Sequence, residues 1–145
     1  MQHIFRYIIG TFKFRLQYGG KTLRKTLYCY ADAAYADNLL SRRSTAGYIV
    51  FLGGGLVLWK SKKQTMVTLS TLEAEFINLT PAGLALLWIN NMLTEFGKGQ
   101  ESLLLLYTDS QNARQTVLNK LNSARTRHID IKYKWVIEKV EEKKF

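Results

Sequence analysis

The sequence predicts one α/β domain in which a mixed sheet carries helices on its faces. Short apolar runs separated by tight turns occupy residues 26–60, and a long amphipathic helical segment begins near residue 70. A further apolar run at 103–108 is followed by helical segments at 111–121 and 129–141. Short runs of this kind, followed and interrupted by helical segments, are typical of a layered α/β domain.

Composition limits the class of protein. The chain has 145 residues, 47% of them hydrophobic, with a single proline, which predicts one folded domain with a real core. Its one cysteine, Cys29, cannot form an internal disulfide and lies in an apolar run, so we expect a buried core residue and an intracellular protein. The net charge of +10 favours a polyanionic partner, with nucleic acid as the default.

The N-terminal segment mixes apolar and basic residues. Ile4, Tyr7 and Ile8 stand at helical spacing, which predicts a short helix before Gly19-Gly20. Arg6 and Lys13 and the lack of a clear cleavage site make it a poor signal peptide. No apolar run reaches 18 residues, so we expect no membrane-spanning helix and no membrane partner.

Three predicted strands follow one another closely. They are Thr26–Ala31, Gly47–Leu52 and Leu56–Lys60, with turns at Ser41–Ser44 and Gly53–Gly55. Tight turns join antiparallel neighbours, so these strands should form a meander.

The long helix has a recognisable start. Ser70-Thr71-Leu72-Glu73 fits a capping box, in which Glu73 reaches back to the N-cap amide and leaves Glu75 free for another role. Pro81 and Gly83 are unfavourable inside a helix and predict a kink or break. The later run Leu103–Tyr107 lacks alternation, as in a central strand covered on both faces.

Three acidic residues lie at the edges of predicted elements. Asp32 closes the first strand, Glu75 lies early in the long helix, and Asp109 ends the run at 103–108. Together they could hold hard divalent cations, as in two-metal nucleases. Taken singly, Asp32 could begin a turn, Asp109 could cap the next helix, and Glu75 could face solvent.

Basic residues gather in several segments of the chain. As candidate nucleic-acid contacts we single out Arg42, Arg43, Lys62, Lys63, Arg125, Arg127 and His128. A solvated basic surface is the alternative reading, and His128 could cap structure instead of contacting a phosphate.

Several motifs, in order, resemble the ribonuclease H domain of Ty1/copia-type retrotransposon polyproteins. They are Tyr30-Ala31-Asp32-Ala33, Arg42-Arg43-Ser44-Thr45-Ala46-Gly47-Tyr48, Trp59–Gln64, Leu69–Phe76, Tyr107-Thr108-Asp109-Ser110-Gln111 and Arg125–Ile131. Residues 1–22 resemble the end of the region that follows reverse transcriptase, and residues 23–145 the ribonuclease H domain.

The resemblance implies a ribonuclease H-like fold and an activity. Asp32, Glu75 and Asp109 would hold two Mg2+ or Mn2+ ions and hydrolyse the RNA strand of an RNA–DNA hybrid. Asp130 is weighed as a fourth ligand, although its position also suits the first turn of a helix.

The chain departs from the family pattern at several points. Ala34 replaces a second acidic residue, Tyr35 replaces a tryptophan, and charges expected near Leu84 and Ala85 are absent. The chain stops at Phe145, before the family's last strand and the helix with its fourth aspartate. We therefore expect impaired catalysis and an open sheet edge at 103–108, so that either a protein partner covers this edge or the domain is weakly stable.

Two other functions compete with the nuclease. One is an inactive descendant that binds nucleic acid or protein. The other is a secreted effector of the oomycete RxLR type that acts in host cells, for example on host defence or cell death, for which Lys21-Thr22-Leu23-Arg24 is the nearest targeting motif, with Lys in place of Arg.

Overall fold

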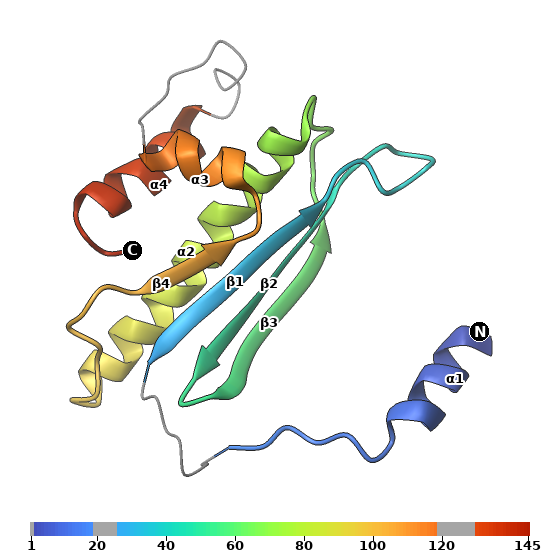
Figure 1. Cartoon of the computed structure of the whole chain (residues 1–145), viewed down its shortest axis with the longest axis horizontal. Helices are drawn as coiled ribbons and strands as arrows, with labels where there is room; N and C mark the ends of the chain where they lie inside the picture. Colours follow the sequence, from blue (N-terminus) through green and yellow to red (C-terminus); the bar gives the residue numbers. More distant parts are fainter. Residues whose placement is uncertain (1, 19–25, 119–129) are drawn as a thin grey trace.

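A four-stranded sheet with helices against it forms the body of the protein (Figure 1). The structure, a computed structural model, describes residues 2–18, 26–118 and 130–145. Its helices are α1 (Gln2–Thr11), α2 (Thr71–Glu95), α3 (Gln111–Leu118) and α4 (Asp130–Glu141), and its strands are β1 (Leu27–Ala34), β2 (Thr45–Leu52), β3 (Gly55–Lys63) and β4 (Leu105–Thr108).

The sheet is mixed, as the sequence predicts. The strand order is β3-β2-β1-β4, and the pairs β3–β2 and β2–β1 are antiparallel. β4 returns after α2 and, among the strands that the structure describes, pairs only with β1, in parallel. The antiparallel meander is confirmed, because the turn at Gly53-Gly54, both with positive φ, joins β2 directly to β3.

One hydrophobic core lies between the sheet and the helices. Alternate side chains of β1, among them Leu27, Cys29 and Ala31, are buried against α2. The same core includes Ala113 and Val117 of α3 and Val136 of α4. Its other members are Val50, Phe76, Ile77, Leu79, Ala82, Leu86, Ile89 and Leu104. The predicted burial of Cys29 is confirmed, and burial raises the pKa of its thiol to about 12, so the thiol stays protonated.

α2 starts as predicted. The Ser70 hydroxyl accepts a hydrogen bond from Glu73 N at 3.2 Å, while the Glu73 carboxylate accepts one from Leu69 N at 2.5 Å. The reciprocal bond therefore falls on the residue before the N-cap and not on the N-cap amide itself. The capping pair fixes where the helix begins.

The predicted break in α2 is wrong. The helix runs without interruption from Thr71 to Glu95, through Pro81 and Gly83. A Cβ added at Gly83 would lie 2.8 Å from the ring of Phe145 and 3.1 Å from that of Trp135. The glycine therefore serves close packing of the C-terminal residues on α2, and that packing outweighs its weak helix propensity.

Each strand differs in its bounds from the prediction; for example, β2 begins at Thr45 instead of Gly47, and β3 ends at Lys63 instead of Lys60. β1 continues to Ala34, because Ala33 and Ala34 pair with Ala46 and Thr45, so Asp32 lies inside the strand. β4 begins at Leu105 and lies at the edge of the sheet among the described strands, which confirms the open edge expected at 103–108 and corrects the central position that its apolar run indicated. Leu104, just before the strand, is buried and Leu106 is partly buried against the core, whereas 42% of Tyr107 is exposed.

α2 is long and apolar enough to cross a membrane by length and composition alone, and it is the one such helix among the described residues. Half of it is buried inside this protein, and its buried residues pack on β1 and β2. We therefore read α2 as the core helix of the domain.

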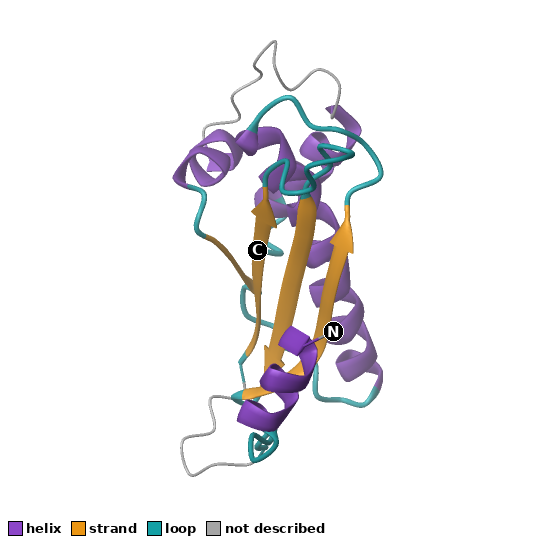
Figure 2. Ribbon diagram, turned by 90° about the vertical axis from the view of Figure 1, so that its right-hand side faces the viewer, coloured by secondary structure: helices purple, strands orange, loops and turns teal. Residues whose placement is uncertain are grey.

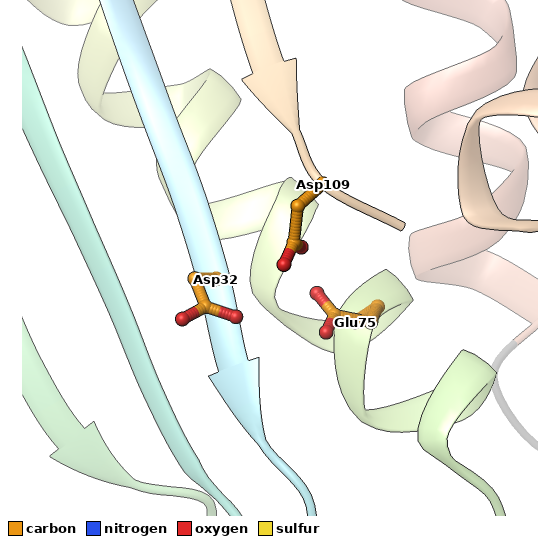
Figure 3. A group of neighbouring side chains, drawn as sticks. All are labelled: Asp32, Glu75 and Asp109. Carbon is orange, nitrogen blue, oxygen red and sulfur yellow. The ribbon is translucent and has the colours of Figure 1, made fainter. Parts of the chain in front are cut away.

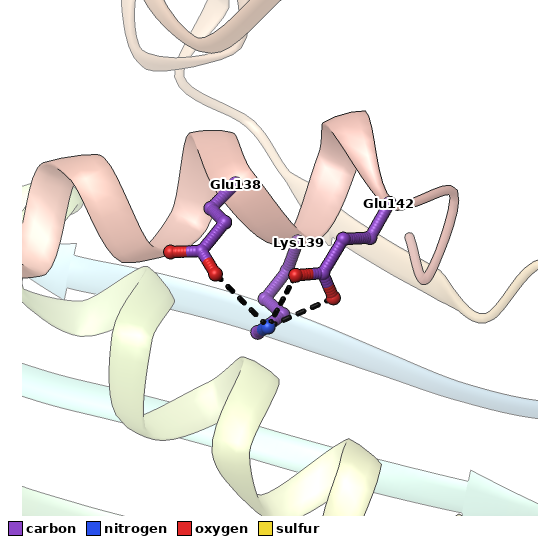
Figure 4. Close-up of polar contacts among 3 residues, drawn as sticks. All are labelled: Glu138, Lys139 and Glu142. Carbon is purple, nitrogen blue, oxygen red and sulfur yellow. Dashed lines mark hydrogen bonds and ion pairs between the residues drawn. The ribbon is translucent and has the colours of Figure 1, made fainter.

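α4 carries a small cluster of charges on its surface. Lys139 lies between Glu138, at 3.5 Å, and Glu142, at 2.8 Å (Figure 4). Exposed ion pairs of this kind contribute little to stability, so α4 is held by its apolar side, where Val136 is buried.

Candidate active site

Three carboxylates from separate parts of the chain converge beside the C-terminal end of β1. Figure 3 shows Asp32 from β1, Glu75 from α2 and Asp109 just after β4 pointing toward one another. One carboxylate oxygen from each lies within 4.8 Å of the others. Asp32 and Asp109 are exposed, whereas Glu75 is only 5% exposed, so the cluster has a buried floor and an open side.

The parallel pairing of β1 and β4 brings the two aspartates together. Ala31 of β1 pairs with Thr108 of β4, and the next residues along the chain are Asp32 and Asp109, respectively. This placement could not be read from the sequence separation of the two residues, because it depends on the crossover through α2.

Asn78 fixes α2 against the sheet at this point. It lies three positions after Glu75, is 1% exposed, and its Nδ2 donates to the backbone oxygens of Asp32 and Gly47, each at 2.7 Å. One amide therefore ties the helix that carries Glu75 to the strand that carries Asp32. Sequence reasoning missed Asn78, although its spacing from Glu75 on one helical face was the available signal.

A second set of buried polar contacts holds the loops at this end of the sheet. Gln64 Nε2 donates to Ala74 O at 2.8 Å, and Gln64 N donates to Ser44 O at 2.8 Å. The hydroxyls of Ser44 and Thr68 lie 3.0 Å apart. The loop before β2, the end of β3 and the start of α2 are thus linked to one another beside the carboxylates.

The electrostatics of the cluster fit a cation. Burial and, after it, the negative charges of Asp109 and Asp32 together raise the pKa of Glu75 to about 7, while a hydrogen bond from the Ala33 amide opposes the shift. An all-oxygen, acidic donor set whose members repel one another is the kind that Mg2+ or Mn2+ prefers. The residues present therefore fit a hard divalent ion.

Of the predicted basic contacts, four fall in the described residues. Arg42 and Arg43 lie exposed in the loop between β1 and β2, and Lys62 and Lys63 lie exposed at the end of β3. Thr45 pairs with both Ala34 and Lys63, so these residues lie at the same end of the sheet as Asp32.

Other predicted residues lie outside the part of the chain that the structure describes. They are Arg125, Arg127 and His128, and the targeting motif Lys21, Thr22, Leu23 and Arg24. Asp130 begins α4, but its side chain is likewise outside the described part, so its role as a fourth ligand stays a prediction.

Known structures share this fold. LC11-RNase H1, isolated from compost by a metagenomic approach, matches with a TM-score of 0.60 at 14% identity, over 81% of this chain and 77% of that one. The same enzyme in complex with an RNA/DNA hybrid matches with a TM-score of 0.55 at 11% identity, over 82% and 79% of the two chains. At such low identity the likeness concerns the fold, which is that of ribonuclease H.

Sequence relatives specify the kind of ribonuclease H-like protein. The chain is 39% identical over 139 residues to the retrovirus-related Pol polyprotein from transposon TNT 1-94 of Nicotiana tabacum, covering 96% of this chain and 10% of that protein. It is 38% identical over 89 residues to the secreted RxLR effector protein 161 of Plasmopara viticola, covering 61% and 62%. No protein-family model matches the chain.

The chain is therefore a ribonuclease H-like domain related to the Pol polyproteins of copia-type retrotransposons, as its motifs indicated. It spans about a tenth of the Pol polyproteins that it matches.

Proposed function

We propose that this domain hydrolyses the RNA strand of RNA–DNA hybrids with divalent metal ions held by Asp32, Glu75 and Asp109. The observation that carries the proposal is the convergence of the three carboxylates within 4.8 Å. A scattered set of surface acids would not combine a buried glutamate with two exposed aspartates from different elements. The hybrid bound to LC11-RNase H1 supports this substrate class by fold analogy.

Each residue has a distinct part in the proposed reaction. Bound Mg2+ or Mn2+, two ions in the full mechanism, would activate water and stabilise the charge that develops on the phosphate. Asp32 and Asp109 face solvent and would hold the ions where a phosphate can reach them. Glu75, whose pKa burial and the two aspartates raise to about 7, would be held as a carboxylate by a bound cation, because a nearby positive charge lowers the pKa of a carboxyl group.

Substrate binding is assigned to the basic residues at the same end of the sheet. Arg42, Arg43, Lys62 and Lys63 are exposed there and would follow phosphates without reading sequence. Arg125, Arg127 and His128 are proposed for the same role. A protein partner that pairs with the free edge of β4 is proposed as well, because an apolar edge strand is prone to pairing.

Cleavage of a labelled RNA–DNA hybrid by the purified chain, with Mg2+ or Mn2+, tests the proposal. Asp109→Asn should lower the cleavage rate by more than about 100-fold. Loss of a residue that only supports a metal ligand costs about 10- to 100-fold, and Asp109 is proposed to be a ligand itself. Asp37→Asn is the matched control, because Asp37 lies outside the cluster and accepts a hydrogen bond from Thr45. Equal cleavage rates in the two variants would show that the carboxylate cluster does not take part in the reaction.

A folded chain that binds hybrid without cleaving it would instead support an inactive nucleic-acid-binding descendant. Binding that survives loss of the carboxylates separates this outcome from a nuclease with weak turnover.

The similarity to RxLR effector protein 161 favours a second candidate, a secreted effector that acts in host cells. This candidate and the intracellular location proposed for the nuclease make opposite predictions. Detection of the mature chain outside the producing cell would support the effector, and strictly intracellular protein would oppose it.

A further inference from the structure

The face of the sheet opposite α2 is apolar, and no element that the structure describes covers it. One row of side chains crosses all four strands: Trp59 pairs with Ile49, Ile49 with Tyr30, and Tyr30 with Tyr107. Their exposed fractions are 61%, 38%, 47% and 42%, whereas the alternate residues Cys29 and Val50 are fully buried. We call the row Trp59–Ile49–Tyr30–Tyr107 the open row. A sheet face of this composition normally packs against a second layer.

Helix α1 also exposes apolar side chains to solvent. Its apolar side chains include Ile4, Phe5 and Ile8, each more than half exposed, and Arg6 lies on the opposite side of the helix. Among the elements that the structure describes, α1 contacts none. An isolated helix of ten residues with several β-branched side chains is marginal in water, so α1 needs a packing partner to persist.

The chain brings α1 to the correct side of the sheet. Figure 2 shows α1 in front of the sheet, on the side away from α2. Beyond α1, the Tyr18 hydroxyl donates a hydrogen bond to the backbone oxygen of Leu56, at the start of β3. The six residues between Thr11 and Tyr18 can span about 20 Å. This reach covers much of the length of β3, which is about 30 Å for its nine residues.

We propose that α1 of the same chain docks on the open row through Ile4, Phe5 and Ile8. Docking removes both unpartnered apolar surfaces from water at once and gives the sheet a layer on each face. The groove beside the open row, about 410 Å3 in volume, is lined in part by Tyr30, Asp32, Trp59 and Lys60, so the docked helix reaches the border of the carboxylate cluster. The proposal does not depend on nuclease activity.

Disulfide trapping in the full chain tests the docking, with Cys29→Ala as the background so that new cysteines are the only thiols. The pair Ile8→Cys with Ile49→Cys should close within one chain at least about tenfold faster than either control pair. One control, Arg6→Cys with Ile49→Cys, uses the polar side of α1. The other, Ile8→Cys with Trp88→Cys, uses a residue of α2 that is 61% exposed.

Equal rates for all pairs would overturn the proposal. A disulfide that forms only between chains would overturn it in favour of a second copy as the occupant. Hydrogen exchange on the parent chain guards against misfolded variants: α1 amides should exchange at least about tenfold more slowly than in a peptide of residues 1–18. Trp59→Ser should remove that protection without changing the protection of α2, and unchanged protection of α1 would also count against the docking.

Discussion

Glu75 is the residue whose chemistry depends most on its surroundings. It is almost fully buried and lies beside two aspartates, which together with burial raise its pKa from 4.5 to about 7. The unfolded chain therefore releases this proton at a lower pH than the folded one does. Without metal, folding stability contributed by this group is lost as pH rises from about 4.5 to about 7.

Glu75→Gln should accordingly stabilise the metal-free protein above pH 7, by up to about 3 kcal/mol, and leave it nearly unchanged at pH 4. Urea unfolding at several pH values, without metal, measures this difference. Glu95→Gln is the matched control, since Glu95 is exposed at the end of the same helix. A Gln variant that gains nothing at high pH would show that Glu75 is not strained by its neighbours.

Asn78 makes a second prediction at the residue scale. Asn78→Leu keeps the approximate size but removes both bonds to the Asp32 and Gly47 carbonyls. Its Oδ1 has no partner among the described residues, so the loss is confined to the donor side. We expect a cost of about 2–4 kcal/mol in the free energy of unfolding. Denaturant unfolding checks it, beside Asn90→Leu, which also breaks an amide link, to Gln100, but away from the cluster.

At the scale of elements, the sequence predicts what local chemistry controls. The cap at Ser70, the turn at Gly53-Gly54 and the meander follow from short-range rules and are confirmed. Continuity of α2 through Pro81 is a tertiary effect, because a helix buried along the sheet tolerates a poor residue. The exposed side of β4 was missed for a similar reason: an apolar run has the same sequence whether one face is covered or two.

Pro81 should therefore cost stability that packing has overcome. Pro81→Ala restores an amide that can donate to the carbonyl of Ile77, four residues earlier, and should stabilise the fold by about 1–3 kcal/mol. Thermal unfolding of the variant, next to Leu84→Ala on the exposed side of α2, measures the gain. A lower melting temperature would mean that the proline ring, which helps line a pocket with Tyr48 and Lys62, packs better than the restored bond compensates.

At the scale of the whole molecule, the motifs identified a family and the fold agrees with it. The proximity of the site residues, however, depends on the tertiary structure. The sequence singled out Asp32, Glu75 and Asp109 as separate residues. Only the parallel pairing of β1 with β4 and the anchoring of α2 bring their oxygens within 4.8 Å. Asn78 and Gln64, which support this arrangement, are polar residues that a sequence pattern does not distinguish from surface ones.

The charge of the whole molecule leads to a last prediction, for hybrid binding. With a net charge of +10, affinity should fall linearly on a log–log plot against salt, by about 0.9 for each phosphate neutralised. Fluorescence anisotropy with a labelled hybrid, in an Asp109→Asn background to prevent cleavage, measures this slope.

Lys63→Gln should reduce the slope by about 1, because Lys63 lies at the same end of the sheet as the carboxylates. Lys98→Gln should leave it unchanged, since Lys98 precedes Gln100, which bonds to Leu27 at the opposite end of β1. Equal slopes for the two variants would mean that the charge acts as a diffuse surface and not through the predicted contacts.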